Sequence, residues 1–209
     1  MVQPNKEAPS IVVIDDDVDV REGLAALLQS VGLRTESFAS VREFLDSGGL
    51  DRARCLVLDV RLPGRSGLDF QDDLIKAKAH LPVVFISGHA DVPMSVRAMK
   101  AGAVEFLTKP VRHQDLLDAI QLAIEQDSVR RKSEDSITAL RARFDSLTGR
   151  EQEVMTLVAA GRMNKQIAEE IGISLPTVKL HRGQAMRKME ARSLAELVRI
   201  ADKLNLVRQ

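Results

Sequence analysis

The stretch Cys55-Leu-Val-Leu-Asp-Val-Arg-Leu-Pro-Gly64 decides the fold of this 209-residue chain. Its first four residues are apolar, which is typical of a strand buried in a parallel sheet. The run ends in the carboxylate of Asp59, and a proline and a glycine then turn the chain into a loop. Open α/β sheets bind ligands just beyond the carboxyl ends of their strands, so Asp59 stands where chemistry is expected. On this stretch alone, an aspartate that only shapes a turn is an equally good interpretation.

Apolar runs that alternate with helical patterns continue on both sides of this stretch. The predicted strands cover residues 11–14, 34–38, 55–59, 83–86 and 104–108. The predicted helices cover residues 20–31, 40–45, 68–75, 92–101 and 111–124. Five strands alternating with five helices predict an α/β fold, a five-stranded doubly wound parallel sheet with right-handed crossovers.

Polar side chains follow four of the predicted strands. Asp15 and Asp16 end the first strand, Asp59 the third, Ser87 the fourth and Lys109 the fifth. Right-handed crossovers bring these ends to one rim of the sheet, so the five side chains are expected in one pocket. Taken singly, the serine could be a turn residue and the lysine a surface residue. Their convergence favours a functional site.

Phosphoryl chemistry fits this set of groups. Three neighbouring carboxylates repel one another and need a cation or raised pKa values at neutral pH. Mg²⁺ suits them because it is a hard ion that takes oxygen ligands and keeps several waters. Lys109 would place a point charge beside a phosphoryl oxygen, and Ser87 would donate to another. Asp59 would then be a nucleophile that becomes an aspartyl-phosphate.

Four short motifs contain these residues, namely Ile14-Asp-Asp-Asp17, Leu58-Asp-Val-Arg-Leu-Pro-Gly64, Ile86-Ser-Gly-His89 and Phe106-Leu-Thr-Lys-Pro110. With them, residues 11–125 resemble the receiver domain of two-component response regulators, which has a flavodoxin-like fold. The resemblance implies that a sensor histidine kinase phosphorylates Asp59. It implies a Mg²⁺ site made by Asp16, Asp59 and the backbone carbonyl of Arg61, with Asp15 acting through water.

The same resemblance implies a conformational switch. Ser87 and Lys109 would contact the phosphoryl group, and Phe106 occupies the family's aromatic switch position, which is more often tyrosine. Without a phenol hydroxyl, the switch would depend on ring packing alone. The surface of the fourth helix, fifth strand and fifth helix would change shape on phosphorylation, and in this family that surface is often a dimer interface.

Charge is distributed unevenly along a chain whose formal net charge is zero. Residues 1–125 hold 14 basic and 19 acidic residues, a net charge of −5, whereas residues 146–209 hold 11 and 7, a net charge of +4. An acidic half that can hold a cation and a basic half that can meet phosphate predict two domains with different partners. The single Cys55 excludes an intrachain disulfide. With no apolar signal region and no apolar run near the ~18 residues of a membrane helix, we expect a soluble, cytoplasmic protein without a membrane partner.

The connector between the halves is polar and mixed in charge over residues 125–136. Neither glycine nor proline occurs between Val111 and Thr148, which argues against a flexible linker. We therefore expect a helix that continues out of the first half, either unbroken or with a break near residues 127–136; a solvated tether is the alternative. The predicted organisation is a receiver domain over 1–125, a helical linker over 126–144 and a second domain over 145–209.

Helix caps divide the last part of the chain into four short helices. Thr148 with Glu151 and Ser193 with Glu196 are predicted capping boxes, and Asn164 and Ser174 are the other candidate N-caps. Two short helices joined by a glycine-containing turn predict a helix-turn-helix, whose second helix, over residues 175–189, would enter the major groove. An exposed basic helix without a ligand is the alternative.

Three segments of this region, Leu147-Thr-Gly-Arg-Glu-Gln-Glu-Val154, Asn164-Lys-Gln-Ile-Ala168 and Thr177-Val-Lys-Leu-His-Arg182, resemble LuxR-type DNA-binding domains. With the receiver, the chain resembles FixJ/NarL-type response regulators. The resemblance implies that Lys179, Leu180 and Gly183 lie toward base edges, and that Lys165, Thr177 and Arg182 touch the DNA backbone. Direct readout would be sparse, so water or DNA shape would carry specificity. A glycine inside a helix lowers the stability by roughly 1 kcal/mol relative to alanine. Either close approach of the backbone to DNA or helix packing would explain a glycine at position 183.

Together these features predict a transcription regulator controlled by phosphorylation. Its partners would be a sensor histidine kinase, promoter DNA and a second copy of the chain, with RNA polymerase as a further one. It would not be an enzyme, beyond its own phosphorylation from a donor and slow autodephosphorylation. A Mg²⁺-dependent phosphohydrolase is one alternative, but it needs an acid/base carboxylate where Arg61 stands. A signalling adaptor that binds no DNA is the other.

Overall fold

The computed structural model of the chain describes residues 10–89 and 91–206. The chain forms two compact units that divide between Arg130 and Arg131. Within the described ranges, no helix is both long and apolar enough to span a membrane.

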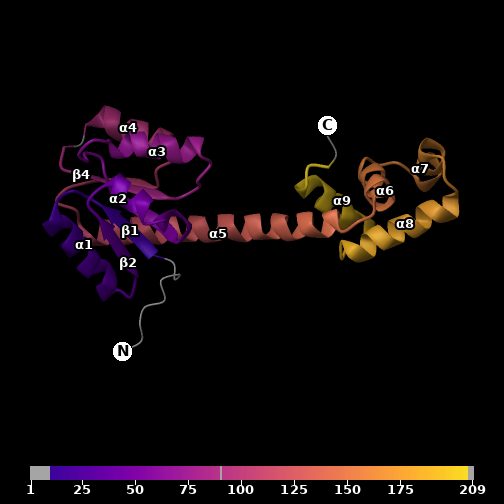
Figure 1. Ribbon diagram of the computed structural model, residues 1–209, viewed down its shortest axis with the longest axis horizontal. Helices are drawn as coiled ribbons and strands as arrows, with labels where there is room; N and C mark the ends of the chain where they lie inside the picture. The colour runs from indigo at the N-terminus through magenta and orange to yellow at the C-terminus, as the bar shows by residue number, and fades with distance from the viewer. Residues whose placement is uncertain (1–9, 90, 207–209) are drawn as a thin grey trace. The chain divides into compact units, whose positions relative to one another are not determined.

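The first unit is built on a parallel sheet (Figure 1). Its strands are β1 (Ser10–Ile14), β2 (Thr35–Phe38), β3 (Ala53–Asp59), β4 (Val83–Ser87) and β5 (Glu105–Thr108). All neighbours pair in parallel, in the spatial order β2-β1-β3-β4-β5. This confirms the predicted doubly wound sheet, with strand ends that differ from the prediction by one or two residues. The strand order reverses direction between β1 and β3, so their ends flank the crevice at which such sheets bind ligands.

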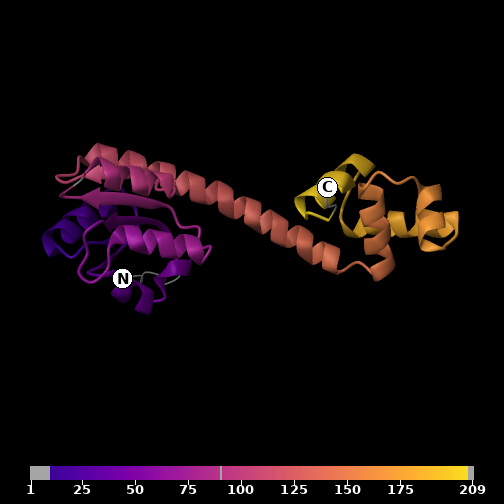
Figure 2. The ribbon, with the colours of Figure 1, turned by 90° about the horizontal axis from the view of Figure 1, so that it is seen from above.

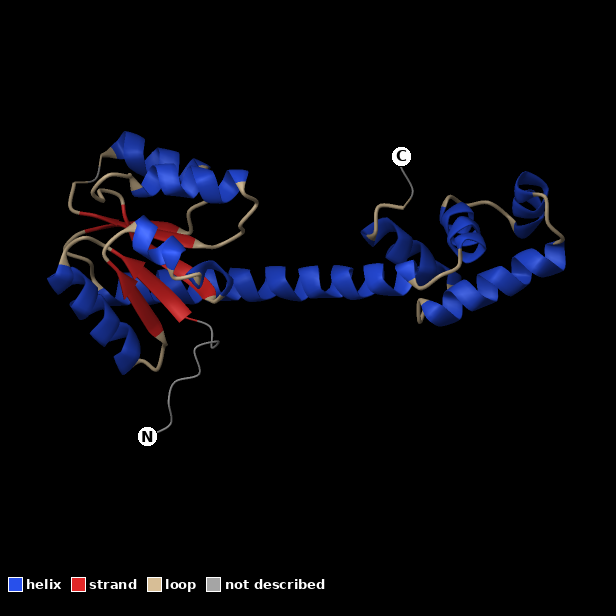
Figure 3. Cartoon of the chain, in the orientation of Figure 1, coloured by secondary structure: helices blue, strands red, loops and turns tan. Residues whose placement is uncertain are grey.

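Helices cover both faces of the sheet, as Figure 3 shows. One face carries α1 (Val18–Ser30) and α5 (His113–Asp145), and the other carries α2 (Val41–Asp46), α3 (Gly67–Lys76) and α4 (Val92–Lys100). A 3₁₀ turn, η1 (Gly49–Asp51), follows α2 and was not predicted. β3 is buried along its length except at Arg54, which explains its apolar composition, because helices enclose both of its faces.

Helix α5 is continuous from His113 to Asp145. The expected helical extension is therefore confirmed, and of its two forms the one with a break near residues 127–136 is wrong. The helix contains neither glycine nor proline, so no residue within it favours an interruption. Polar composition alone does not end a helix, because most of the side chains of this segment remain in contact with water.

Four helices follow α5 in the second unit, which Figure 2 shows in orange and yellow, and they share one apolar core with Leu140 and Phe144 of α5. They are α6 (Gly149–Ala159), α7 (Asn164–Ile171), α8 (Leu175–Lys188) and α9 (Leu194–Lys203). On α8, Val178 and Ala185 are buried in this core, and so is the C-cap residue Met189. The capping box at Thr148 is confirmed: its hydroxyl accepts from the Glu151 N–H at 3.3 Å, and the Glu151 carboxylate accepts from the Thr148 N–H at 2.8 Å.

One predicted N-cap and one predicted capping box differ from the structure. The N-cap of α7 is Met163, not Asn164, and the Gln166 carboxamide oxygen accepts from the Met163 N–H at 2.8 Å. At α9 the Ser193 hydroxyl accepts from the Glu196 N–H as predicted, but the Glu196 carboxylate accepts from the N–H of the preceding Arg192. A flexible glutamate reaches either of two neighbouring amides, so the sequence pattern does not determine which one it takes.

Candidate functional site

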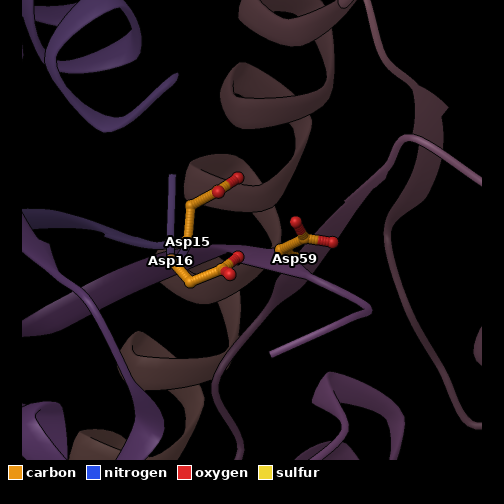
Figure 4. Close-up of side chains that lie close together, drawn as sticks. All are labelled: Asp15, Asp16 and Asp59. Carbon is orange, nitrogen blue, oxygen red and sulfur yellow. The ribbon is translucent and has the colours of Figure 1, made fainter. Parts of the chain in front are cut away.

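Three carboxylates meet where β1 and β3 end. Asp15 and Asp16 follow β1, Asp59 ends β3, and the two strands pair at Ile14 and Leu58, which brings the residues after them together. One oxygen from each carboxylate lies within 4.8 Å of the others, and Figure 4 shows the three side chains side by side. The first and third aspartates are buried whereas Asp16 is exposed, so the cluster is accessible from one side.

Lys109 bridges the two buried carboxylates. Its ammonium lies 2.6 Å from Asp15 Oδ2 and 2.6 Å from Asp59 Oδ2. Burial raises the pKa of Asp15 above its ordinary value, and the hydrogen bond from Lys109 only partly offsets this. Burial opposes the charge on Lys109, but hydrogen bonds to both carboxylates raise its pKa overall and keep the ammonium protonated. Three carboxylates and one ammonium carry a formal charge of about −2, which a divalent cation would balance.

Backbone amides hold the remaining oxygens of the buried carboxylates. Asp59 Oδ1 accepts from the Arg61 N–H at 3.0 Å, and Asp15 Oδ1 accepts from the Asp17 N–H at 3.0 Å. Each side chain is thus fixed by a loop amide on one oxygen and by Lys109 on the other. The oxygens are oriented before any ligand arrives, which limits the reorganisation that a reaction would require.

The other two predicted switch residues lie on neighbouring strands. Ser87 ends β4 and is buried, and its hydroxyl exchanges hydrogen bonds with the backbone of His89, at 3.1 Å to the carbonyl and 3.3 Å from the N–H. Phe106, on β5, is partly buried and packs against Phe85, with ring centroids 6.1 Å apart. In this arrangement the serine hydroxyl is bound to its own loop.

Gly67 is a site residue that the sequence reasoning missed. It begins α3, and a Cβ built on it would overlap the carbonyl oxygen of Asp59. Its N–H donates to the Val60 carbonyl at 3.0 Å, while the Ser66 hydroxyl caps α3. The start of α3 therefore packs directly on the backbone of the central aspartate. A serine followed by glycine just after the Pro63-Gly64 turn was the available signal, but it did not reveal this contact.

The predicted DNA-binding residues lie on α7 and α8. Exposed positions include Lys165, Lys179, Gly183 and Leu180, which is 59% exposed, whereas Thr177 and Arg182 are partly buried. Arg182 donates to the Asn164 side chain at 3.1 Å, so one predicted backbone contact also joins the two helices. A Cβ at Gly183 would meet no atom within 4 Å. Packing inside the second unit therefore does not require this glycine, which removes one of its two explanations.

Comparison with known proteins assigns both units. Residues 11–121 match the family described as "Response regulator receiver domain", and residues 145–201 match "Bacterial regulatory proteins, luxR family". Nodulation protein W of Bradyrhizobium diazoefficiens is 51% identical over 94% of this chain and 86% of its own length. Transcriptional regulatory protein FixJ of Azorhizobium caulinodans is 42% identical over 93% of this chain and 92% of its own. The solved structure of the response regulator StyR is 48% identical, with a TM-score of 0.82 over 94% of this chain and 99% of that one. The chain therefore belongs to the two-component response regulators that combine a receiver domain with a LuxR-type DNA-binding domain.

Proposed function

We propose that Asp59 receives the phosphoryl group of a sensor histidine kinase, and that this modification controls binding of the second unit to promoter DNA. The position of Asp59 carries the proposal. It lies at the crevice of the sheet, beside Asp15 and Asp16, with the Lys109 ammonium 2.6 Å from its carboxylate. The functional domains would cover residues 1–125 and 145–209, joined by residues 126–144 as a helical linker.

The transfer is a substitution at phosphorus. A carboxylate oxygen of Asp59 forms a bond to phosphorus, the P–N bond to the kinase histidine breaks, and the imidazole leaves with a proton from solvent. Lys109 would turn from Asp15 toward a phosphoryl oxygen. The Ser87 hydroxyl would give up its hydrogen bonds with His89 and donate to a second phosphoryl oxygen. The same site would accept a small phosphodonor and would slowly lose the group to water.

The acidic cluster fits Mg²⁺. We assign the ion to Asp16, Asp59 and the Arg61 carbonyl, with Asp15 acting through water, because these oxygen donors leave about two negative charges unbalanced beside Lys109. When bound, Mg²⁺ supplies positive charge that offsets repulsion between the carboxylates and the incoming phosphoryl group.

A change of packing would carry the signal outward. Movement of Ser87 toward the phosphoryl group frees space beside β5, and the ring of Phe106 would shift into it. The surface formed by α4, β5 and the start of α5 would then favour a dimer. A dimer presents two α8 helices to two half-sites, which raises the effective concentration of the second helix.

The helix-turn-helix would bind DNA in the orientation that its exposed residues suggest. Lys179, Leu180 and Gly183 would face base edges, while Lys165, Thr177 and Arg182 would contact phosphates. RNA polymerase is a further proposed partner at such promoters. Because the target is bacterial DNA, we propose that the chain acts in the cytoplasm.

Binding to genomic DNA fragments at fixed salt tests the proposal. The full chain is compared with and without acetyl phosphate and Mg²⁺, beside Asp59→Ala. We expect phosphorylation to tighten binding and Asp59→Ala to abolish the gain. Equal binding in all three cases would mean that Asp59 is not the control point. Absence of DNA binding at modest salt would instead favour a signalling adaptor.

A further inference from the structure

Helix α5 carries a buried carboxylate on the face that packs against the sheet. Leu116, Ala119, Ile120 and Ala123 form the buried apolar part of this face. Asp127 continues the same stripe one turn later and is 1% exposed. The inward face of such a helix is normally apolar, and a buried carboxylate requires partners.

Two arginines surround this carboxylate. Arg54 Nη1, near the start of β3, lies 2.9 Å from Asp127 Oδ2, and Arg130 Nη2, three residues further along α5, lies 2.5 Å from Oδ1. The contact with Arg54 joins residues 73 positions apart in the sequence. We call Arg54, Asp127 and Arg130 the α5 clamp. It lies at the opposite end of β3 from Asp59.

The physical chemistry of buried ion pairs suggests what the clamp does. Such a pair adds little stability over apolar packing, because removing both charges from water costs about as much as their attraction recovers. Loss of an arginine is costly, because it removes a partner from the buried Asp127 carboxylate, whereas the arginines are themselves partly exposed. A clamp of this kind therefore selects one arrangement: rotation or sliding of α5 on the sheet would separate Asp127 from Arg54.

The clamp stands at the end of the first unit. That unit extends to Arg130, whereas α5 continues as one helix to Asp145. We propose that the clamp fixes the register of α5 on the sheet at the point where the helix leaves the receiver, and that Asp127 is a positioning residue for transmitting the phosphorylation signal along α5. This inference rests on the proposed function, because it takes phosphorylation of Asp59 as the signal.

Cys55 provides a native probe of the clamp. It is the single cysteine of the chain, follows Arg54 on β3, and is fully buried in the apolar cluster that includes Ile120 and Ala123 of α5. Burial, together with the nearby Asp127 carboxylate, raises the pKa of its thiol far above the ordinary range, so it reacts slowly while covered. A thiol reagent reaches Cys55 only when the helix layer opens, and the labelling rate under native conditions therefore reports that opening.

The test compares two aspartate-to-asparagine variants on the same helix in the full chain. Asp127→Asn removes the negative charge of the clamp and leaves its two arginines in place. Asp115→Asn is the matched control, because Asp115 pairs with Arg112 at 3.8 Å on the surface and its side chain is 44% exposed. We expect Asp127→Asn to raise the labelling rate of Cys55 about tenfold or more, because a neutral amide cannot replace the charge-assisted hydrogen bonds that the buried carboxylate makes with both arginines. Asp115→Asn should stay within about twofold of the wild type.

The second measurement is the gain in DNA affinity on treatment with acetyl phosphate and Mg²⁺, with phosphorylation of Asp59 measured by intact mass. Before treatment, we expect Asp127→Asn to bind DNA with the affinity of the unphosphorylated wild type. After treatment it should carry the phosphoryl group, but most of the gain in DNA affinity should be lost. Arg54→Lys keeps a positive charge but loses the guanidinium fork, so it should weaken the coupling without unfolding the receiver. If Asp127→Asn does not fold, the same two measurements are made on Arg54→Lys instead.

The outcomes separate the clamp from the proposed function. A full gain in DNA affinity in Asp127→Asn would overturn the inference, because the clamp would then have no part in transmission. This holds whether Cys55 is labelled at the wild-type rate or faster. If the wild type itself shows no gain, the proposed function fails. In that case unchanged labelling also overturns the clamp, whereas faster labelling supports its role in holding α5.

Discussion

Replacing Gly183 by alanine should raise the stability of the second unit and lower its affinity for DNA. Gly183 lies in the middle of α8, and a Cβ there would meet no atom within 4 Å. Alanine therefore removes the entropic cost of a helical glycine without introducing a clash, which is worth about 1 kcal/mol in the free energy of unfolding. For a folding unit of roughly 60–100 residues, this corresponds to an increase in Tm of about 4–8 °C.

The affinity for DNA should change in the opposite direction. If the backbone of α8 approaches the bases at Gly183, an added methyl group holds the helix away from the groove and weakens the neighbouring contacts of Lys179 and Leu180. One good base contact is worth about 1–3 kcal/mol, so the Kd should rise by about fivefold to 150-fold.

Calorimetry and fluorescence anisotropy measure the two effects. The chain has neither tryptophan nor tyrosine, so calorimetry follows unfolding better than intrinsic fluorescence. Anisotropy of labelled DNA at fixed salt gives the Kd. Gly23→Ala is the matched control, because Gly23 is an exposed residue inside α1 whose Cβ would also meet nothing within 4 Å. A Gly183→Ala variant with higher Tm and unchanged Kd would refute the close approach to DNA, and one with unchanged Tm would refute the stability argument.

Three further predictions follow from the site and from the second core. Mg²⁺ at about 100 times its Kd should raise the free energy of unfolding of the first unit by about 2.7 kcal/mol, and Asp16→Asn should remove most of this gain in a calorimetric titration; an equal gain in the variant would contradict the ligand assignment. Gly67→Ala should cost about 1–3 kcal/mol in denaturant unfolding and slow phosphorylation of Asp59, because its Cβ overlaps the Asp59 carbonyl oxygen; wild-type values for both would contradict the close packing. The hydrogen bond from Lys188, at 2.6 Å, lowers the pKa of Glu151, whose side chain is 7% exposed. This contribution to stability is complete above the ordinary pKa of glutamate, which applies in the unfolded state, and is lost as the pH falls through the lower pKa of the folded state. Glu151→Gln should therefore show a flatter loss of Tm in acid than the wild type.

The sheet and its acidic crevice could be predicted because both depend on short-range patterns. Each buried strand is a run of apolar residues, and each functional side chain stands at the end of such a run, as Asp59 follows Cys55 to Leu58. Parallel topology then brings the ends together without any knowledge of packing. This explains why Asp15, Asp16, Asp59 and Lys109 could be assigned to one cluster from the sequence.

The features that escaped prediction depend on long-range packing. Asp127 lies in a polar segment that looks like a solvated connector, and only its contact with Arg54 shows that it is buried. Gly67 resembles any glycine after a turn until the backbone of Asp59 is placed against it. In both cases the residue type is explained by a neighbour distant in the sequence or by a tight approach of two backbones, and neither leaves a periodic signal.

Lys109 balances the charges of the two buried carboxylates before phosphorylation. Its ammonium is also the group that phosphorylation of Asp59 would displace. One ammonium serves the buried carboxylates of Asp15 and Asp59 equally, at 2.6 Å from each. A phosphoryl group on Asp59 would replace the single charge of this carboxylate by about 1.5–2 negative charges on the phosphoryl oxygens, which would draw the ammonium away from Asp15. Lys109 follows β5 directly, and α5 begins four residues later at His113, so its displacement acts on the connection that starts α5. A helix that can be displaced at its first turn transmits motion only if it is held in register further along, and Asp127 is the residue that meets this requirement.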